Sequence, residues 1–234
     1  MILDALRGLA LLGIALANFP EFALWTFLSA DEQQAMATAG IDSVVRYLQY
    51  MLVDGKFYSI FSLLFGVGFS LILSRHPVSL FVRRMLILAV IGFCHLMFIW
   101  SGDILLLYAL SVVPMAAGYV TAMCLWYQLS CQPRTIVNYP YSIFNWLAAP
   151  GRMALSNYIS QSLTGVLLFY GFGFGWGCSF GLVYVELTAF AVFVLQIVVC
   201  KWWFRHFRFG PFEWVWRMLT YGRYFQFKVT KEDV

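Results

Sequence analysis

The residues best suited to a catalytic role are two polar side chains that lie inside long apolar stretches. His95 lies in the apolar stretch 82–100 and is the only histidine inside such a stretch. Histidine is the side chain whose ordinary pKa lies closest to neutral, so it suits a general base, a nucleophile or a proton relay, but it also forms plain hydrogen bonds between helices. Asn18 lies in the first apolar stretch, residues 5–28. We take His95 and Asn18 as candidate catalytic residues, with interhelical hydrogen bonding as the alternative for each.

Charged residues near the start of the first stretch form a second group. Asp4 precedes Arg7 by three residues, a spacing that pairs opposite charges on one face of a helix. Arg7 and Asn18 are eleven residues apart, or about three helical turns, so they share a face. Either these side chains line a polar cavity, or Asp4 and Arg7 pair at one end of the helix and reach the membrane surface.

Three further polar residues complete the predicted site. Asp103 follows the stretch 82–100, where it can serve a ligand or cap the next helix. Asn157 and Gln161 are four residues apart and face the same way on a helix. We predict that one cavity holds the candidate catalytic pair and the following substrate-binding residues: Asp4, Arg7, Asp103, Asn157 and Gln161. Although the chain has five cysteines, it has no CxxC pair or cysteine–histidine spacing typical of a metal site, so we expect none.

The composition requires a membrane around these side chains. The chain has 234 residues, of which 62% are hydrophobic and 11% are charged, and its mean hydropathy is +0.79. A soluble domain carries about 25% charged residues, so too little polar surface is available here to coat a water-soluble globule. The composition excludes a nucleic-acid-binding domain, a secreted disulfide scaffold and a disordered chain.

Continuous apolar runs without strand alternation predict an all-α, polytopic transmembrane bundle. Six stretches are candidates to span: 5–28, 57–74, 82–100, 104–127, 153–171 and 182–200. We expect an amphipathic helix over 41–54 at the outer interface, an irregular cytoplasmic connection over 129–150 and a short interfacial helix over 211–221. The predicted divisions are therefore 1–128 with four spans, 129–150 as a connection, 151–200 with the remaining spans, and 201–234 as a basic, aromatic tail.

The basic residues orient this bundle. Of the 15 Lys and Arg residues, all but Arg46 and Lys56 fall on one side of the predicted membrane, and basic residues favour the cytoplasmic side. We expect a multi-pass membrane protein with both termini in the cytoplasm. Arginines and tryptophans alternate in the tail 201–234, which favours contact with anionic lipids of the inner leaflet. Because this tail adjoins a spanning helix, we expect no nucleic-acid partner.

Five stretches, in this order, resemble the YeiB-like family of bacterial inner-membrane proteins of unknown function. They are LDALRGLALLGIALAN at 3–18, KFYSIFSLLFGVGF at 56–69, RR with GFCHLMFIWSGDILLLYA within 83–109, GRMALSNYISQS at 151–162 and FRFGPFEWVWRMLTYG at 207–222. That family is similar to the superfamily of transmembrane acyltransferases. The resemblance implies a membrane tunnel through which an acyl group passes from a cytoplasmic donor to an acceptor on the far side.

The chain departs from its family in two ways. Family members commonly carry additional helices between the GDILLLYA and GRMALSNY blocks, where this chain has only residues 110–150, so it resembles an internally shortened member. The superfamily places a catalytic histidine shortly after an asparagine of the first helix. Asn18 matches that asparagine, but no histidine precedes His76, so the superfamily's chemistry does not transfer residue by residue.

Three functions remain open from the sequence. The first is an acyltransferase-like enzyme that uses acyl-CoA or another acyl donor, with Asn18 and His95 near the acyl tunnel and Arg7 at its cytoplasmic mouth. The second is a transporter or permease component in which the same polar stripe forms a passage. The third is a structural or degenerate membrane protein without catalysis, a reading that the missing helices favour. The sequence does not determine the substrate or the oligomeric state.

Overall fold

The computed structural model describes residues 2–73, 76–102 and 143–229, and every regular element in them is a helix. The all-α prediction is therefore confirmed for this part of the chain, in which the β structure is an isolated bridge between Phe207 and Lys228. The expected span 104–127 and the candidate residue Asp103 lie outside the described residues.

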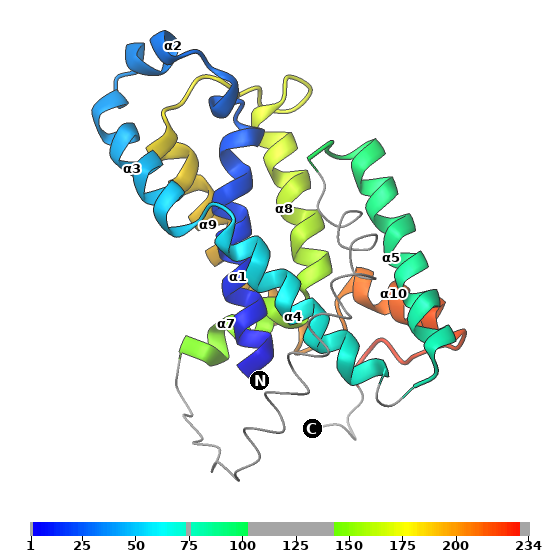
Figure 1. The fold of residues 1–234 in the computed structure, drawn as a ribbon. Coiled ribbons are helices and arrows are strands. Elements are labelled where there is room, and N and C mark those ends of the chain that lie inside the picture. The colour runs from blue at the N-terminus through cyan, green and yellow to red at the C-terminus, as the bar shows by residue number, and fades with distance from the viewer. Residues whose placement is uncertain (1, 74–75, 103–142, 230–234) are drawn as a thin grey trace.

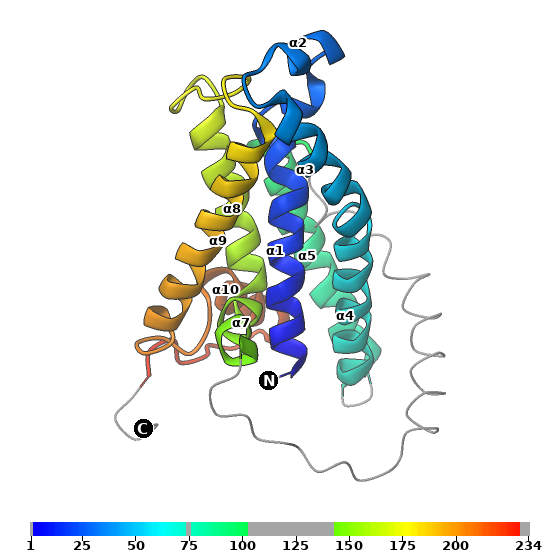
Figure 2. The ribbon, with the colours of Figure 1, turned by 90° about the vertical axis from the view of Figure 1, so that its left-hand side faces the viewer.

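The helices form one bundle around α1 (Figures 1 and 2). In chain order they are α1 (Ile2–Phe22), the 3-10 turn η1 (Trp25–Phe27), α2 (Ala30–Ala35), α3 (Ala39–Leu52), α4 (Lys56–Leu73), α5 (Val78–Phe98), α7 (Ile143–Arg152), α8 (Ala154–Phe169), α9 (Leu182–Trp203) and α10 (Pro211–Tyr221). Figure 1 shows α2 and α3 at one end of the bundle, here called the α3 end. The start of α1, α7 and α10 lie toward the opposite end, here called the α10 end.

Within the described ranges, three helices are long and apolar enough to cross a membrane: Leu3–Phe22, Val78–Phe98 and Leu182–Trp203. Two other expected spans form α4 and α8, with 18 and 16 residues, and both pack against α1. The long helices leave large apolar side chains exposed around the bundle, such as Leu86, Val90 and Leu195. This pattern fits helices whose outer faces meet lipid rather than water.

Helix α1 ends earlier than the stretch 5–28 predicted, because Leu24 adopts a left-handed conformation with φ 59° and turns the chain into η1. Pro20 lies inside α1 and has no backbone N–H, so the carbonyl of Leu16 loses its helical partner. The buried Gln49 of α3 replaces that bond, since its Nε2 donates to the Leu16 carbonyl at 3.0 Å. The proline therefore creates the acceptor by which α3 attaches to α1.

Glycines allow α1 and α7 to approach very closely. A Cβ on Gly151 would lie 1.7 Å from the Asp4 carbonyl oxygen, and one on Gly8 would lie 1.9 Å from the Leu147 carbonyl oxygen. Both obstacles are backbone atoms, which cannot rotate away. Small residues at such crossings let two backbones pack directly in a membrane protein.

Both predicted interfacial helices form. The range 41–54 falls on α3 as far as Leu52, where that helix ends, and α10 covers the predicted range 211–221, with Pro211 at its start and Gly222 at φ 65° ending it. The connection expected to be irregular over 129–150 is partly helical instead, because Ile143 begins α7. Pro150 interrupts the hydrogen bonding near the end of that helix, and Met153 separates it from α8.

Candidate functional site

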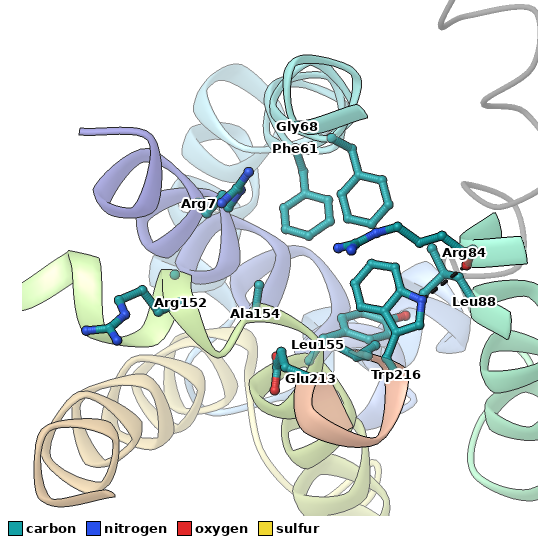
Figure 3. Close-up of a pocket in the computed structure, with 13 residues that line it drawn as sticks. Arg7, Phe61, Gly68, Arg84, Leu88, Arg152, Ala154, Leu155, Glu213 and Trp216 are labelled. Carbon is teal, nitrogen blue, oxygen red and sulfur yellow. Dashed lines mark hydrogen bonds between the residues drawn. The ribbon is translucent and has the colours of Figure 1, made fainter. Parts of the chain in front are cut away.

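A cavity of about 330 Å³ lies at the α10 end, between α1, α4, α5, the end of α7, α8 and α10 (Figure 3). We call it the α10 cavity. Its wall is mostly apolar, with aromatic rings from three helices. The apolar and aromatic lining residues are Phe61, Phe65, Leu88, Ala154, Leu155, Tyr158 and Trp216, with Gly68 and Gly151 at close approach.

Two arginines bring positive charge to this cavity. Arg7 of α1 forms an ion pair with Asp4 at 3.1 Å, so the pairing predicted from their spacing is confirmed. Arg84 of α5 lies with its guanidinium carbon 3.9 Å from the ring centre of Trp216, whose Nε1 donates to the Arg84 carbonyl at 3.1 Å. The buried Nε of Arg84 has no hydrogen-bond partner among the described residues. The cavity thus holds a cation whose bonding capacity is not filled by the protein around it.

Arg152 also borders the α10 cavity, but Figure 3 shows its guanidinium pointing away from the other lining residues. That group lies 4.2 Å from the ring centre of Phe204 in α9. Arg152 therefore borders this cavity without directing its charge into it, and its guanidinium group lies at a different surface.

Glu213 supplies the acid of the cavity and joins α10 to α8. Its Oε1 accepts the backbone N–H of Ser156 at 3.0 Å, its Oε2 accepts the Ser156 hydroxyl, and that hydroxyl accepts the N–H of Phe212 at 3.1 Å. Each helix thus caps the N-terminus of the other. Burial raises the pKa of Glu213, while the hydrogen bonds from Ser156 partly oppose the rise.

Tyr158 connects the cavity to His95. Tyr158 lines the cavity, and its ring centre lies 5.3 Å from that of His95. His95 is 2% exposed, and its spacing from Arg84 and Leu88, eleven and seven residues along α5, places all three on one helical face. The candidate base therefore lies about 16 Å along α5 from the cationic part of the cavity, at 1.5 Å per residue.

Asn18 is buried beside α4 rather than in the α10 cavity. Its side chain is 5% exposed, and its Oδ1 accepts the hydroxyl of Tyr58. This contact is the interhelical hydrogen bond that we gave as the alternative to catalysis.

Asn157 and Gln161 lie on the side of α8 that faces α9. Asn157 Nδ2 donates to the Pro150 carbonyl at 3.0 Å and contacts Cys200 Sγ at 3.2 Å, while Gln161 Nε2 donates to Gln196 Oε1 at 2.9 Å. Both amides are buried, and their bonds hold α8 against α9. These contacts give both residues a structural role.

The six predicted site residues that the structure describes are therefore not gathered in one cavity. Arg7 alone among the described ones lines the α10 cavity, whereas Asp4 borders a separate hollow between α7 and α9. Arg84 escaped the sequence analysis because it lies near the start of the apolar stretch 82–100. Glu213 and Trp216 escaped it because they lie in the basic, aromatic tail 201–234, where charged and aromatic side chains usually meet water or headgroups. The common face of Arg84, Leu88 and His95 was the signal available in the sequence.

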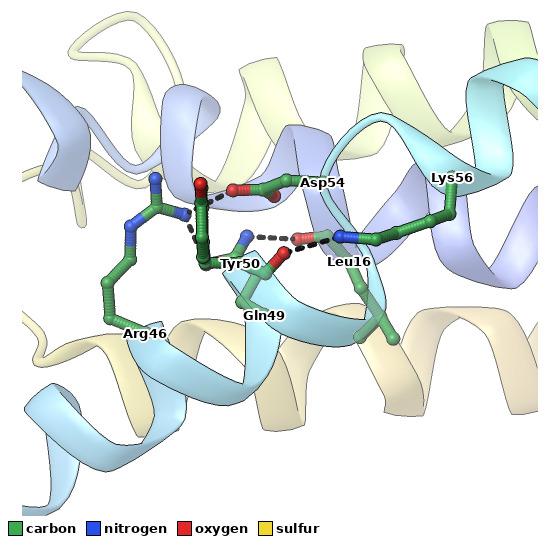
Figure 4. Close-up of polar contacts among 6 residues, drawn as sticks. All are labelled: Leu16, Arg46, Gln49, Tyr50, Asp54 and Lys56. Atoms are coloured by element: carbon green, nitrogen blue, oxygen red, sulfur yellow. Dashed lines mark hydrogen bonds and ion pairs between the residues drawn. The ribbon is translucent and has the colours of Figure 1, made fainter.

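Polar contacts at the α3 end connect helices instead of lining a cavity (Figure 4). Arg46 forms an ion pair with Asp54 at 3.0 Å and also bonds Gln49, which reaches the Leu16 carbonyl. Lys56 donates to the carbonyl of Tyr50 at 2.7 Å. No group of three His, Cys, Asp or Glu side chains within the described ranges is placed to hold a metal ion.

Comparison with known proteins places these features in a sequence family. The family described as "Protein of unknown function (DUF418)" matches residues 74–223, a range that contains Arg84, His95, Tyr158 and Glu213. The protein YeiB of Escherichia coli strain K12 is 30% identical over 162 residues, which cover 69% of this chain and 39% of YeiB. YxaH of Bacillus subtilis strain 168 is 41% identical over 83 residues, which cover 34% of this chain and 20% of YxaH.

A third relative covers nearly the whole chain. An uncharacterised 39.9 kDa protein encoded beside an amylase in Bacillus acidopullulyticus is 27% identical over 342 aligned positions, which span 98% of this chain and 96% of the relative. Since this chain has only 234 residues, that alignment contains long gaps within it. No solved structure matches this chain.

Proposed function

This chain belongs to the DUF418 family, and from its resemblance to transmembrane acyltransferases and the geometry of the α10 cavity we propose that it is an acyltransferase-like protein of the bacterial inner membrane. It takes an acyl donor at its cytoplasmic side and transfers the acyl group to an acceptor on the far side. The donor is acyl-CoA or another carrier with an anionic head.

The proposed topology has six spanning helices with both termini in the cytoplasm. Helices α1, α4, α5, α8 and α9 supply five spans, and residues 104–127 supply the sixth. The α10 end then faces the cytoplasm, which agrees with the concentration of basic residues there. The basic, aromatic tail lies on the inner leaflet, where it contacts anionic lipids.

The observation that carries the proposal is the chain of contacts from Arg84 to His95. Arg84 lines the cavity and carries a buried donor that no described residue fills, Trp216 and Leu88 line the same cavity, and Tyr158, also in its wall, lies against the ring of His95. An anionic head fits the arginines because guanidinium groups bind phosphate oxygens well. An acyl chain fits the aromatic and aliphatic wall. A single ligand with both parts accounts for both chemistries in one cavity.

His95 acts as general base in the proposed reaction. It takes the proton of the acceptor hydroxyl as the hydroxyl oxygen bonds to the acyl carbonyl carbon. The carbon–sulfur bond of the thioester then breaks, and the proton passes from His95 to the leaving thiolate. Arg7 and Arg84 hold the head of the donor, while Asp4 positions Arg7 through their ion pair.

The test is turnover of a long-chain acyl-CoA by the purified protein in lipid vesicles, with free thiol release as the readout. His95→Gln should lower the rate about 10²–10⁴-fold, as expected for the loss of a general base. His206→Gln is the matched control, since His206 is exposed and lies outside the spanning helices. Arg84→Gln should raise the donor concentration needed for half-maximal rate. If His95→Gln turns over as fast as the unchanged protein, His95 has no part in the mechanism.

A passage for a small amphiphile is the second candidate, because the α10 cavity would admit the same ligand at the start of a route across the membrane. The same vesicles separate the two functions. Movement of the intact acyl compound across the membrane without thiol release would establish transport and exclude transfer.

A further inference from the structure

A second hollow, of about 550 Å³, lies at the α10 end between α7 and α9. We call it the α7–α9 hollow. Three cations from two helices border it: Arg152 at the end of α7, and Lys201 and Arg205 at and just beyond the end of α9. The acid that borders it, Asp4, is already paired with Arg7 at 3.1 Å. The hollow therefore carries a net positive charge.

Aromatic rings hold two of these cations, Lys201 and Arg152, in place. Lys201 Nζ lies 2.9 Å from the ring centre of Trp146, and the guanidinium carbon of Arg152 lies 4.2 Å from that of Phe204. Each contact pairs a residue of α7 with one in or beside α9. None of the three cations forms an ion pair in the part of the chain that the structure describes. Rings stabilise a cation through their faces but do not neutralise its charge, so an anion remains attractive at this site.

The surroundings of the hollow indicate a lipid. Along α9, large, apolar and exposed side chains flank Lys201 on the outer surface: Val198 and Val199 precede it, and Trp202 follows it. Tryptophan favours the headgroup level of a membrane, and lysine and arginine near helix ends reach the same level. An apolar face that leads directly to a cluster of cations matches the acyl chains and the phosphate of one phospholipid.

We propose that the α7–α9 hollow is a binding site for an anionic phospholipid of the cytoplasmic leaflet, with its phosphate held by Arg152, Lys201 and Arg205. Its leaflet rests on the proposed topology, whereas binding itself does not. This site is separate from the α10 cavity, since the guanidinium of Arg152 points away from that cavity (Figure 3). The bound lipid would join α7 to the end of α9 and stabilise the junction where Pro150 interrupts the helix.

The experiment measures lipids retained by the purified protein in a mild detergent, by native mass spectrometry with phosphatidylglycerol and phosphatidylcholine as paired probes. The unchanged protein should retain phosphatidylglycerol in preference to phosphatidylcholine. Lys201→Gln and Arg205→Gln should each weaken phosphatidylglycerol binding about five-fold, which is the contribution of one basic residue at an anionic surface. Inorganic phosphate at millimolar concentration should not displace the lipid.

Arg223→Gln is the matched control. Arg223 also belongs to the tail and lies against an aromatic ring, 5.0 Å from the ring centre of Phe225, but it does not border the hollow. Equal loss in Arg223→Gln would mean diffuse attraction and would overturn the site, as would unchanged retention in both hollow variants. Displacement by phosphate alone would assign the hollow to a free anion instead of a lipid.

Arg205 is exposed, so its variant tests the site even where Lys201→Gln fails to fold. Thiol release from acyl-CoA is measured on the same variants, and it separates failure of this site from failure of the acyltransferase proposal.

Discussion

The two ends of the bundle attach a short helix by the same device. At the α3 end, Asp42 of α3 accepts the N–H of Val183 at 2.9 Å, in the first turn of α9. At the α10 end, Glu213 of α10 accepts the N–H of Ser156 at 3.0 Å, in the first turn of α8. In both cases a carboxylate far away in sequence caps a long helix whose own N-cap residue offers no side chain for the purpose.

The surroundings of the two carboxylates differ. Asp42 is 2% exposed and also accepts the hydroxyl of Thr38 at 2.7 Å, with Gly181 leaving just enough room for both. Glu213 instead borders the α10 cavity together with Arg7 and Arg84. The same cap therefore closes the structure at one end and borders a cavity at the other. The α3 end holds helices together, while the α10 end holds the cavity to which we assign the proposed function.

The largest effect should come from filling the closest backbone contact at the α10 end. Gly151→Ala places a Cβ against the Asp4 carbonyl, so α1 and α7 must separate, and the unfolding free energy should fall by about 3 kcal/mol. Gly181→Ala at the α3 end meets only the Thr38 and Asp42 side chains, which can rotate, and should cost about 1–2 kcal/mol. Unfolding of the purified variants in a mild detergent measures both.

Gly40→Ala is the control for these glycine variants. A Cβ at this position in α3 meets no atom within 4 Å, and alanine favours a helix over glycine, so stability should stay equal or rise by up to about 1 kcal/mol. A larger loss for Gly181→Ala than for Gly151→Ala would contradict the ranking of the two ends.

The next prediction concerns the N-terminal cap of α9 at the α3 end. Asp42→Ala removes the acceptor for Val183 and for Thr38 in a buried place, so the unfolding free energy should fall by about 2 kcal/mol. Asp42→Asn keeps an oxygen for the Val183 N–H and should lose less than about half of that amount. The comparison uses the same unfolding measurement, and equal losses in the two variants would show that the charge, not the hydrogen bond, matters.

The smallest effect is a difference in pH dependence between the ends. Burial raises the pKa of Glu213, so the folded state holds this proton more tightly than the unfolded chain. The unfolding free energy should therefore rise as the pH falls from above this raised pKa toward the ordinary value of 4.5. Glu213→Gln should remove that rise.

Glu32 in α2, at the α3 end, should show the opposite sign. Its hydrogen bonds with the backbone and hydroxyl of Ser29 lower its pKa. Its contribution to stability is present above the ordinary pKa and is lost as the pH falls through the lowered value. Unfolding at several pH values should separate Glu32→Gln from Glu213→Gln, and the same trend in both variants would refute the assignment.

The predicted site shows where sequence reasoning stopped. Spacing correctly paired Asp4 with Arg7, because residues three apart meet within one helix. It placed Asn157 and Gln161 on one face of a helix but left open what that face touches, and the structure places α9 there. Arg84 and Glu213 lie on different helices, 129 positions apart along the chain, and the sequence had no signal that α10 would return to α5 and α8.

The sequence by itself determined that the described part of the chain is all-α, with helices long and apolar enough to cross a membrane, and it located the short helices α3 and α10. Composition and helical period are local properties, so they need no knowledge of neighbours. Only the tertiary structure decided which polar groups face a cavity and which face another helix. In a membrane protein, a buried polar side chain can find its hydrogen-bond partner in a ligand, in water or in a neighbouring helix. Which of these partners it has depends on where helices distant in sequence cross.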